Sequence, residues 1–168
     1  MSLVTEEQRA KAEIYQGDSL CQEKCQFLLK EVSLPNGLLP LKDIIECGYI
    51  EETGFVWLKQ KKKIEHTFKK IGRLVSYATE ITAYVENLRI RKLTGVKAKE
   101  LFIWITLTDI SADGGEEAGK SSAGKVTFHS STGLYRTFPA AAFVIEEDEE
   151  KKKEEEVKEK VVNEVNKA

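Results

Sequence analysis

The sequence predicts a mainly β (α+β) protein, with an antiparallel barrel or sandwich-like body of about eight strands and N-terminal helices packed on it. Three observations lead to this prediction. Apolar residues recur at helical spacing before residue 35. After residue 37 the segments are short, alternate with a period of two and are rich in β-branched and aromatic residues. From residue 146 onward the composition changes to a charged tail, which we expect to be helical or disordered.

Two N-terminal helices are expected, because two capping-box patterns occur in which a hydroxyl residue precedes a glutamine by three positions. The patterns start at Thr5 and Ser19. The segment 35–37, Pro-Asn-Gly, should end the second helix, since proline removes a donor and Asn-Gly readily takes positive φ. One apolar stripe on this helix predicts a face that packs against the body: Cys21, Cys25, Leu28, Leu29 and Val32.

The strands are expected at short spacing, separated by turns that contain glycine or charged residues. The segment 101–107 is apolar on both faces, so we expect it to be central and covered, plausibly by the second helix. The eight expected strands are residues 44–49, 55–59, 64–68, 74–78, 81–93, 100–111, 125–129 and 134–138.

The chain of 168 residues suits one domain with extensions. We divide it into an N-terminal helical extension (1–18), a single β-rich domain with its docking helix (19–145) and the charged tail (146–168). The tail holds ten acidic and six basic residues, and its first part, 146–156, has no apolar residue. It therefore cannot contribute to a core, and a solvated helix or a segment that recruits a protein partner are the two alternatives for it.

The N-terminus lacks the apolar run of a secretory signal, and no apolar segment is long enough to span a bilayer, so we expect a cytoplasmic protein without a transmembrane segment. The three cysteines should be reduced thiols. The residues suggest no cofactor and no nucleic-acid partner, because the body carries little net charge and no recognised module appears. The oligomeric state stays open.

One segment, 114–121, satisfies the phosphate-loop pattern. A working phosphate loop must enter a helix whose N-terminus faces the phosphates, whereas this segment leads into the expected strand at 125–129. The two glutamates within it would also oppose a polyphosphate. We therefore interpret it as a loop between strands.

The histidines, His66 and His129, lie far apart and lack the spacing of a metal or catalytic site. Cys21 and Cys25 belong to the apolar stripe, where a thiol usually packs as a small hydrophobe. We expect neither a zinc site nor cysteine catalysis from these residues.

Bases are concentrated at Lys59, Lys61, Lys62 and Lys63 and in the segment 69–73. This cluster either meets an anionic headgroup or phosphate, or forms a charged hairpin turn that discourages edge-to-edge aggregation.

Several separated blocks resemble the plant family of unknown function numbered 538, over roughly residues 20–143. They read Leu-Pro-Asn-Gly-Leu-Leu-Pro-Leu at 34–41, Glu-Thr-Gly-Phe-Val-Trp-Leu at 52–58, Ile-Thr-Ala-Tyr-Val at 81–85, Leu-Phe-Ile-Trp-Ile-Thr-Leu-Thr-Asp-Ile at 101–110 and Tyr-Arg-Thr-Phe-Pro-Ala-Ala-Ala-Phe at 135–143. The resemblance implies a mostly β, barrel-like fold with an N-terminal helix. It also implies a link to stress, a similarity to lipid-binding bactericidal, permeability-increasing proteins, and chlorophyll binding or hydrolysis. Many relatives look secreted, and no catalytic motif carries over.

The leading hypothesis is a non-enzymatic module that binds an apolar or amphipathic molecule, a lipid or a pigment such as chlorophyll. Trp57, Phe102 and Trp104 are the pocket candidates, and Lys61, Lys62 and Lys63 would meet a headgroup. The alternatives are an esterase-like hydrolase, for which the sequence offers no activated nucleophile, and an interaction module that uses the tail.

Overall fold

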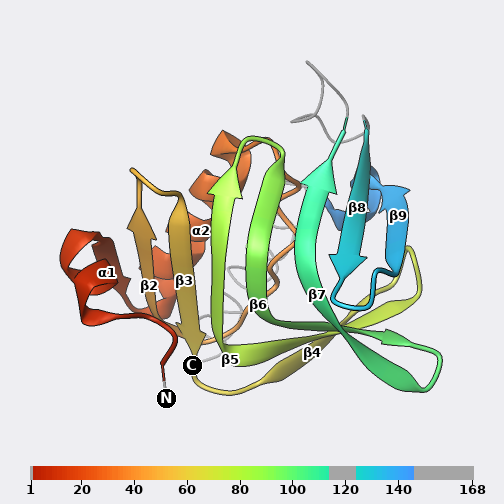
Figure 1. The fold of residues 1–168 in the computed structure, drawn as a ribbon, viewed down its shortest axis with the longest axis horizontal. Helices are drawn as coiled ribbons and strands as arrows, with labels where there is room; N and C mark the ends of the chain where they lie inside the picture. Colours follow the sequence, from red (N-terminus) through yellow and green to blue (C-terminus); the bar gives the residue numbers. More distant parts are fainter. Residues whose placement is uncertain (1, 114–123, 146–168) are drawn as a thin grey trace, which may run out of the picture.

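The computed structural model describes residues 2–113 and 124–145, which form one antiparallel sheet with one long helix and a short 3-10 helix on its inner face (Figure 1). The sheet has nine strands in the order β1-β2-β3-β5-β6-β7-β8-β9, and β4 pairs with β5 off this path. The strands are β1 (Glu13–Gln16), β2 (Ile44–Ile50), β3 (Phe55–Gln60), β4 (Ile64–Phe68), β5 (Arg73–Glu86), β6 (Arg89–Glu100), β7 (Ile103–Ala112), β8 (Lys125–Ser130) and β9 (Tyr135–Pro139).

The mainly β prediction is confirmed. Within the described part of the chain the sheet does not close, because β1 and β9 stand at the two ends of the strand order. None of the described helices is long and apolar enough to cross a membrane.

The first helix, α1 (Glu6–Lys11), has the predicted capping box. The Thr5 hydroxyl accepts the Gln8 N–H at 3.1 Å, and the Gln8 side chain accepts the Thr5 N–H at 2.9 Å. Each interaction pairs an N–H that the helix leaves without a partner.

The second helix, α2 (Asp18–Glu31), begins and ends earlier than the sequence suggested. Its N-cap is Gly17 at φ +91°, with no side-chain cap, so the capping box expected at Ser19 is wrong. The cause is β1, which pairs with β2 and brings the chain to a turn that favours glycine. The helix ends before Pro35, with Val32 as its C-cap and Ser33 in the left-handed region.

A bend in β5 gives the sheet its curvature. The first half of this strand pairs with β4 and the second half with β3, and the pairing with β6 shifts register between them. Gly95 on β6 permits the close approach, because it has φ +83° and an added Cβ would meet the Glu80 carbonyl oxygen.

The two faces of the sheet have separate cores. On the inner face, α2, the segment 34–41 and the 3-10 helix η2 (Ala140–Phe143) pack against the strands. The predicted stripe on α2 faces this core: Cys21, Cys25, Leu29 and Val32 are buried and Leu28 packs at the edge. On the outer face the N-terminal arm covers a smaller cluster of Val4, Ile50, Phe55 and Trp57.

Two strand assignments from the sequence are wrong. The break expected between the strands 74–78 and 81–93 is absent, because β5 runs unbroken to Glu86. The chain turns instead at residues 87–88, inside the second expected strand. This turn has neither glycine nor proline, and Leu88 takes φ +64° while its N–H bonds to the Val32 carbonyl at 2.7 Å. This hydrogen bond to a distant part of the chain, and not the local sequence, therefore determines where the chain turns. The short edge strand β1 was missed altogether.

The expectation that the segment 101–107 is covered is wrong for its first four residues. Leu101 and Phe102 form the turn between β6 and β7 and are 86% and 96% exposed. Ile105 and Leu107 are buried, and β7 lies inside the sheet between β6 and β8. The phosphate-loop segment 114–121 and the whole of the expected tail, 146–168, lie outside the described residues, although the strand expected after that segment is present as β8.

Candidate functional site

A cavity of about 320 Å³ lies between α2 and the inner face of the sheet. Its lining comes from β1, α2, β2, β3, β5 and β6, because α2 lies closest to β1 and β2 and leaves space between itself and the next strands. The view in Figure 1 has α2 behind these strands.

The floor of this cavity is apolar. The floor consists of strand residues whose side chains alternate onto the inner face of the sheet. These side chains are therefore buried or half-buried. They are Val56 and Leu58 from β3, Ile81, Ala83 and Val85 from β5, and Ile90 and Leu93 from β6.

The mouth of the cavity is polar and aromatic. Phe27 on α2 is 61% exposed there, and the Lys24 ammonium lies 4.8 Å from the centre of the Tyr15 ring. The Tyr15 hydroxyl donates to the Glu13 carboxylate at 2.9 Å, an interaction that raises the pKa of Tyr15. Tyr49, Glu31 and Glu51 complete the mouth. One ammonium therefore stands among three carboxylates.

Two thiols belong to the wall of this cavity. Burial raises the pKa of Cys25 to about 12, and it also raises the pKa of Cys47. Both side chains are therefore neutral thiols at physiological pH and act as apolar lining rather than nucleophiles.

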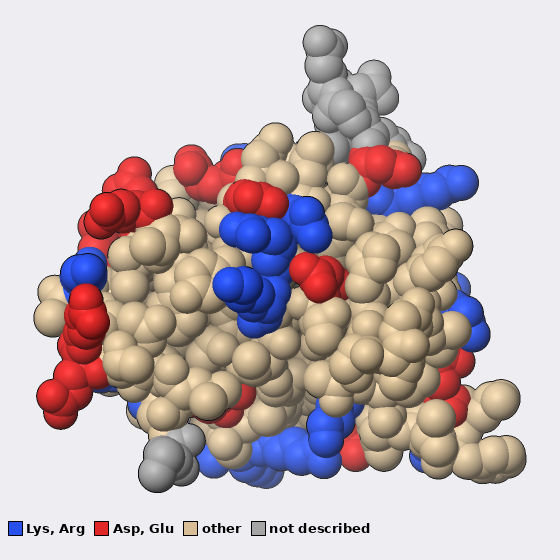
Figure 2. Space-filling model, viewed as in Figure 1, with Lys and Arg blue, Asp and Glu red and all other residues tan. Residues whose placement is uncertain are grey.

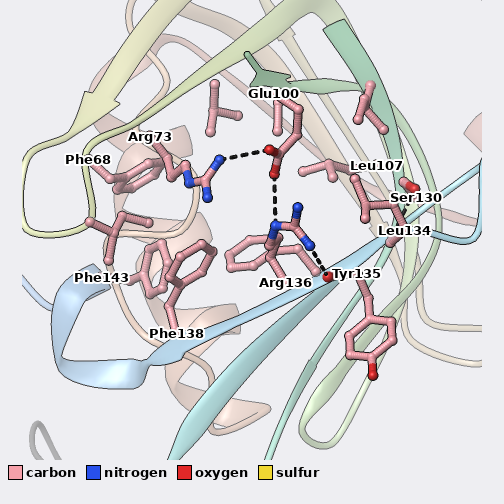
Figure 3. A pocket seen from close by; sticks show the side chains of 15 residues that line it. Phe68, Arg73, Glu100, Leu107, Ser130, Leu134, Tyr135, Arg136, Phe138 and Phe143 are labelled. Atoms are coloured by element: carbon pink, nitrogen blue, oxygen red, sulfur yellow. Dashed lines mark hydrogen bonds and ion pairs between the residues drawn. The ribbon is translucent and has the colours of Figure 1, made fainter. Parts of the chain in front are cut away.

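A second cavity, of about 40 Å³, lies under the other half of the sheet, beside η2 (Figure 3). Glu100 lies between two arginines at its rim, with Oε2 3.0 Å from Arg73 Nη1 and Oε1 3.1 Å from Arg136 Nε. Phe68, Phe138 and Phe143 fill much of the remaining space. This cavity has room for a water molecule or so. The larger cavity is therefore the candidate site.

A family model matches the chain over residues 25–144, and its description is "Protein of unknown function, DUF538". This match covers more than half of the chain. The chain belongs to this family. No curated protein and no solved structure matches the chain.

The DUF538 match includes the floor of the larger cavity but begins at Cys25. It leaves out α1, β1 and the first half of α2, which contribute Glu13, Tyr15 and Lys24 to the mouth. The apolar floor is thus within the family region, whereas half of the mouth is outside it.

Trp57, predicted as a pocket residue, lies on the outer face of this DUF538 sheet. It is fully buried below the N-terminal arm, and its indole N–H donates to Glu46 Oε2 at 3.2 Å. Neighbouring Gly48 makes room for the ring, since a Cβ there would meet it. Trp57 lines neither cavity and belongs to a core.

Phe102 and Trp104, the other two pocket candidates, lie at the exposed end of the β6–β7 hairpin and line neither cavity. Lys61, Lys62 and Lys63 are exposed between β3 and β4, where the Lys61 N–H bonds to the Asp43 carbonyl at 3.1 Å. The structure does not bring these six residues together into one pocket.

The residues that do form the cavity mouth were not among the sequence candidates. One signal was available: Phe27 is not part of the apolar stripe of α2, so helical spacing alone places this large aromatic side chain toward solvent. The remaining lining could not be recognised, because its residues are typical of any core.

His66 lies on β4 and His129 on β8, and no described hydrogen bond joins either imidazole to a serine or cysteine. Among the residues that the structure describes, no group of histidine, cysteine and acidic side chains is arranged to hold a metal ion.

Proposed function

We propose that this DUF538 protein binds one amphipathic small molecule, with an apolar chain in the cavity under α2 and a neutral or zwitterionic head at its mouth. The observation that carries this proposal is an apolar space of about 320 Å³ that opens between charged and aromatic side chains. That combination is typical of small-molecule sites.

The volume favours a single-chain ligand. Ligand pockets usually measure about 300–1,000 Å³, so this one lies at the small end of the range. An engineered cavity of about 150 Å³ accommodates benzene, so twice that space suits one acyl chain of moderate length. A two-chain lipid or a whole chlorophyll needs more room than these walls provide.

The charges at the mouth favour a particular head. Glu13, Glu31 and Glu51 would repel an anionic head, whereas they attract a quaternary ammonium, which also stacks well on tyrosine rings such as those of Tyr15 and Tyr49. Lys24 is available to a phosphate. A lysophosphatidylcholine has both groups and one chain, so we use it as the test ligand.

A displacement titration tests this proposal. The neutral dye N-phenyl-1-naphthylamine is bound to delipidated protein and then displaced by lysophosphatidylcholine. The substitution Ala83→Phe places a ring in the cavity, because Ala83 is buried and forms part of the floor. It should weaken lysophosphatidylcholine binding at least about ten-fold, while the thermal midpoint should be unchanged or higher because the ring fills an existing cavity.

The matched control is Ile45→Phe, which places the same ring at an exposed position of β2 outside the cavity. This control should bind like the wild type, and lysophosphatidic acid, which lacks the choline, should bind more weakly than lysophosphatidylcholine. A wild type that takes up neither dye nor lipid, or an Ala83→Phe variant that binds both normally, contradicts the proposal.

A further inference from the structure

Four consecutive apolar residues form an exposed tip on the β6–β7 hairpin, which we call the hairpin tip: Leu101, Phe102, Ile103 and Trp104. Their exposed fractions are 86%, 96%, 63% and 38%. Tyr135, 61% exposed, adds another aromatic side chain at the nearby start of β9. Isolated exposed apolar residues are ordinary, but a contiguous group of this kind marks an interaction surface.

Folding alone does not account for these residues. Glu100 pairs with Ile103, so Leu101 and Phe102 are the two central residues of a tight hairpin turn. Such turns favour Asn-Gly or Gly-containing pairs because they need positive φ. Leu101 nevertheless takes φ +53°, a region that is costly for leucine. The tip therefore accepts both backbone strain and exposed apolar surface, as functional segments do.

Basic side chains lie close to the hairpin tip. The Lys99 ammonium lies 5.8 Å from the centre of a Trp104 ring, and Lys97 is exposed on the same strand. The one carboxylate of this strand end, Glu100, is already paired with Arg73 and Arg136. The tip thus has apolar residues at its apex, aromatic rings beside them and cationic groups behind.

The shape of the molecule presents this tip. In Figure 1 the β6–β7 hairpin extends beyond the remaining sheet at the lower right, and Figure 2 shows uncharged side chains protruding at that corner. The turn between β3 and β4, with Lys61, Lys62 and Lys63, lies toward the same lower edge of Figure 1. Figure 2 has basic side chains along that edge.

We propose that the hairpin tip inserts into the interface of an anionic lipid bilayer, with the neighbouring lysines facing the headgroups. From apex to base, the side chains of the tip match the layers of a bilayer from its interior outward. These layers are the hydrocarbon, an interface that favours tryptophan and tyrosine, and an anionic surface that attracts lysine and arginine. A projecting apolar apex suits a deformable lipid surface. This inference does not depend on the cavity ligand.

A vesicle flotation assay tests it. Full-length protein is mixed at low salt with phosphatidylcholine vesicles that do or do not contain about 30% phosphatidylserine, the anionic lipid that polybasic segments prefer. We expect binding to the anionic vesicles that weakens with added salt. The double substitution L101N/F102G should reduce the partition coefficient at least about ten-fold, because it removes the two most exposed apolar side chains.

The same double variant also controls for folding, since asparagine tolerates the positive φ of position 101 and glycine fits any turn position, so the thermal midpoint should stay equal or rise. The matched control Ile45→Thr removes apolar surface from an exposed site outside the tip and should bind vesicles like the wild type. L101N/F102G should also keep wild-type dye displacement, which separates this inference from the proposed cavity function.

Tryptophan fluorescence gives a second readout. Trp57 is fully buried, so only Trp104 should respond to vesicles, with a blue shift and quenching by brominated acyl chains. Three results would overturn the proposal: no binding of the wild type to either vesicle, equal binding of L101N/F102G, or a tip-dependent dimer or protein complex that forms without lipid affinity.

Discussion

Glu46 links the N-terminal arm to the outer face of the sheet. It is 7% exposed and accepts hydrogen bonds from both terminal nitrogens of Arg9, at 2.9 and 2.7 Å. Gln16 and Trp57 donate to it as well, at 2.9 and 3.2 Å. A buried carboxylate with this many donors is stabilised in its charged form. The Arg9 hydrogen bonds, followed by those of Trp57 and Gln16, lower the pKa of Glu46 to about 2.

This shift predicts a pH dependence of stability. The folded-state pKa lies below the unfolded value of about 4.3, so the contribution is complete above that value and is lost as the pH falls towards about 2. Its size is on the order of 3 kcal/mol. Urea unfolding between pH 2 and 7 should show this loss in the wild type and a flatter profile, with lower stability at pH 7, in Glu46→Gln. Parallel profiles for the two proteins would contradict the assignment.

At the scale of the elements, the bend in β5 depends on one side chain from β3. The Gln60 amide, 2% exposed, donates to the carbonyls of Tyr77 and Ala78 at 3.0 Å each. The regular pairing with β6 stops after Tyr77, where the register shifts, and the Gln60 amide supplies a donor to the two carbonyls at this point. The curvature that leaves space under α2 therefore relies on Gln60.

Gln60→Leu should keep the volume but leave buried carbonyls without a donor, which costs about 1–3 kcal/mol in the free energy of unfolding. The control Gln26→Leu removes one amide hydrogen bond, which Gln26 donates to the Asn36 carbonyl at 2.8 Å, at a half-buried site where water can replace it. It should cost clearly less in the same denaturant titration. Equal costs would show that the bend does not depend on Gln60.

The elements differ in how far their sequences determine them. The stripe on α2 and the capping box at Thr5 were predictable, because both rest on local spacing. The turn at residues 87–88 and the start of α2 at Gly17 were not, since contacts with Val32 and with β2 fix them. The hairpin tip was wrongly predicted to be covered, because a run of apolar residues was expected to be buried.

At the scale of the whole molecule, one curved sheet separates two cores and leaves a cavity on the inner one. The mainly β architecture and the family followed from strand spacing and from blocks spread over the chain. The cavity did not, because it arises where α2 stops covering the strands, and no residue pattern encodes that gap. Trp57 looked like a ligand residue in sequence but lies in the outer core.

The lining of this cavity was not among the predicted site residues for the same reason. Aromatic residues were chosen as candidates, whereas the cavity floor consists of aliphatic residues such as Leu58, Ile81 and Leu93, which serve equally well in a filled core. Only the placement of α2 relative to β3, β5 and β6 distinguishes a cavity from close packing.

Native mass spectrometry tests the central claim, that the cavity under α2 holds an amphipathic ligand, most directly. Wild type and Ala83→Phe are incubated with lysophosphatidylcholine and compared at the same protein concentration. The account predicts a one-to-one adduct above the 19.0 kDa chain for the wild type and little or none for Ala83→Phe. Equal adducts on both proteins, or none on either, would contradict it.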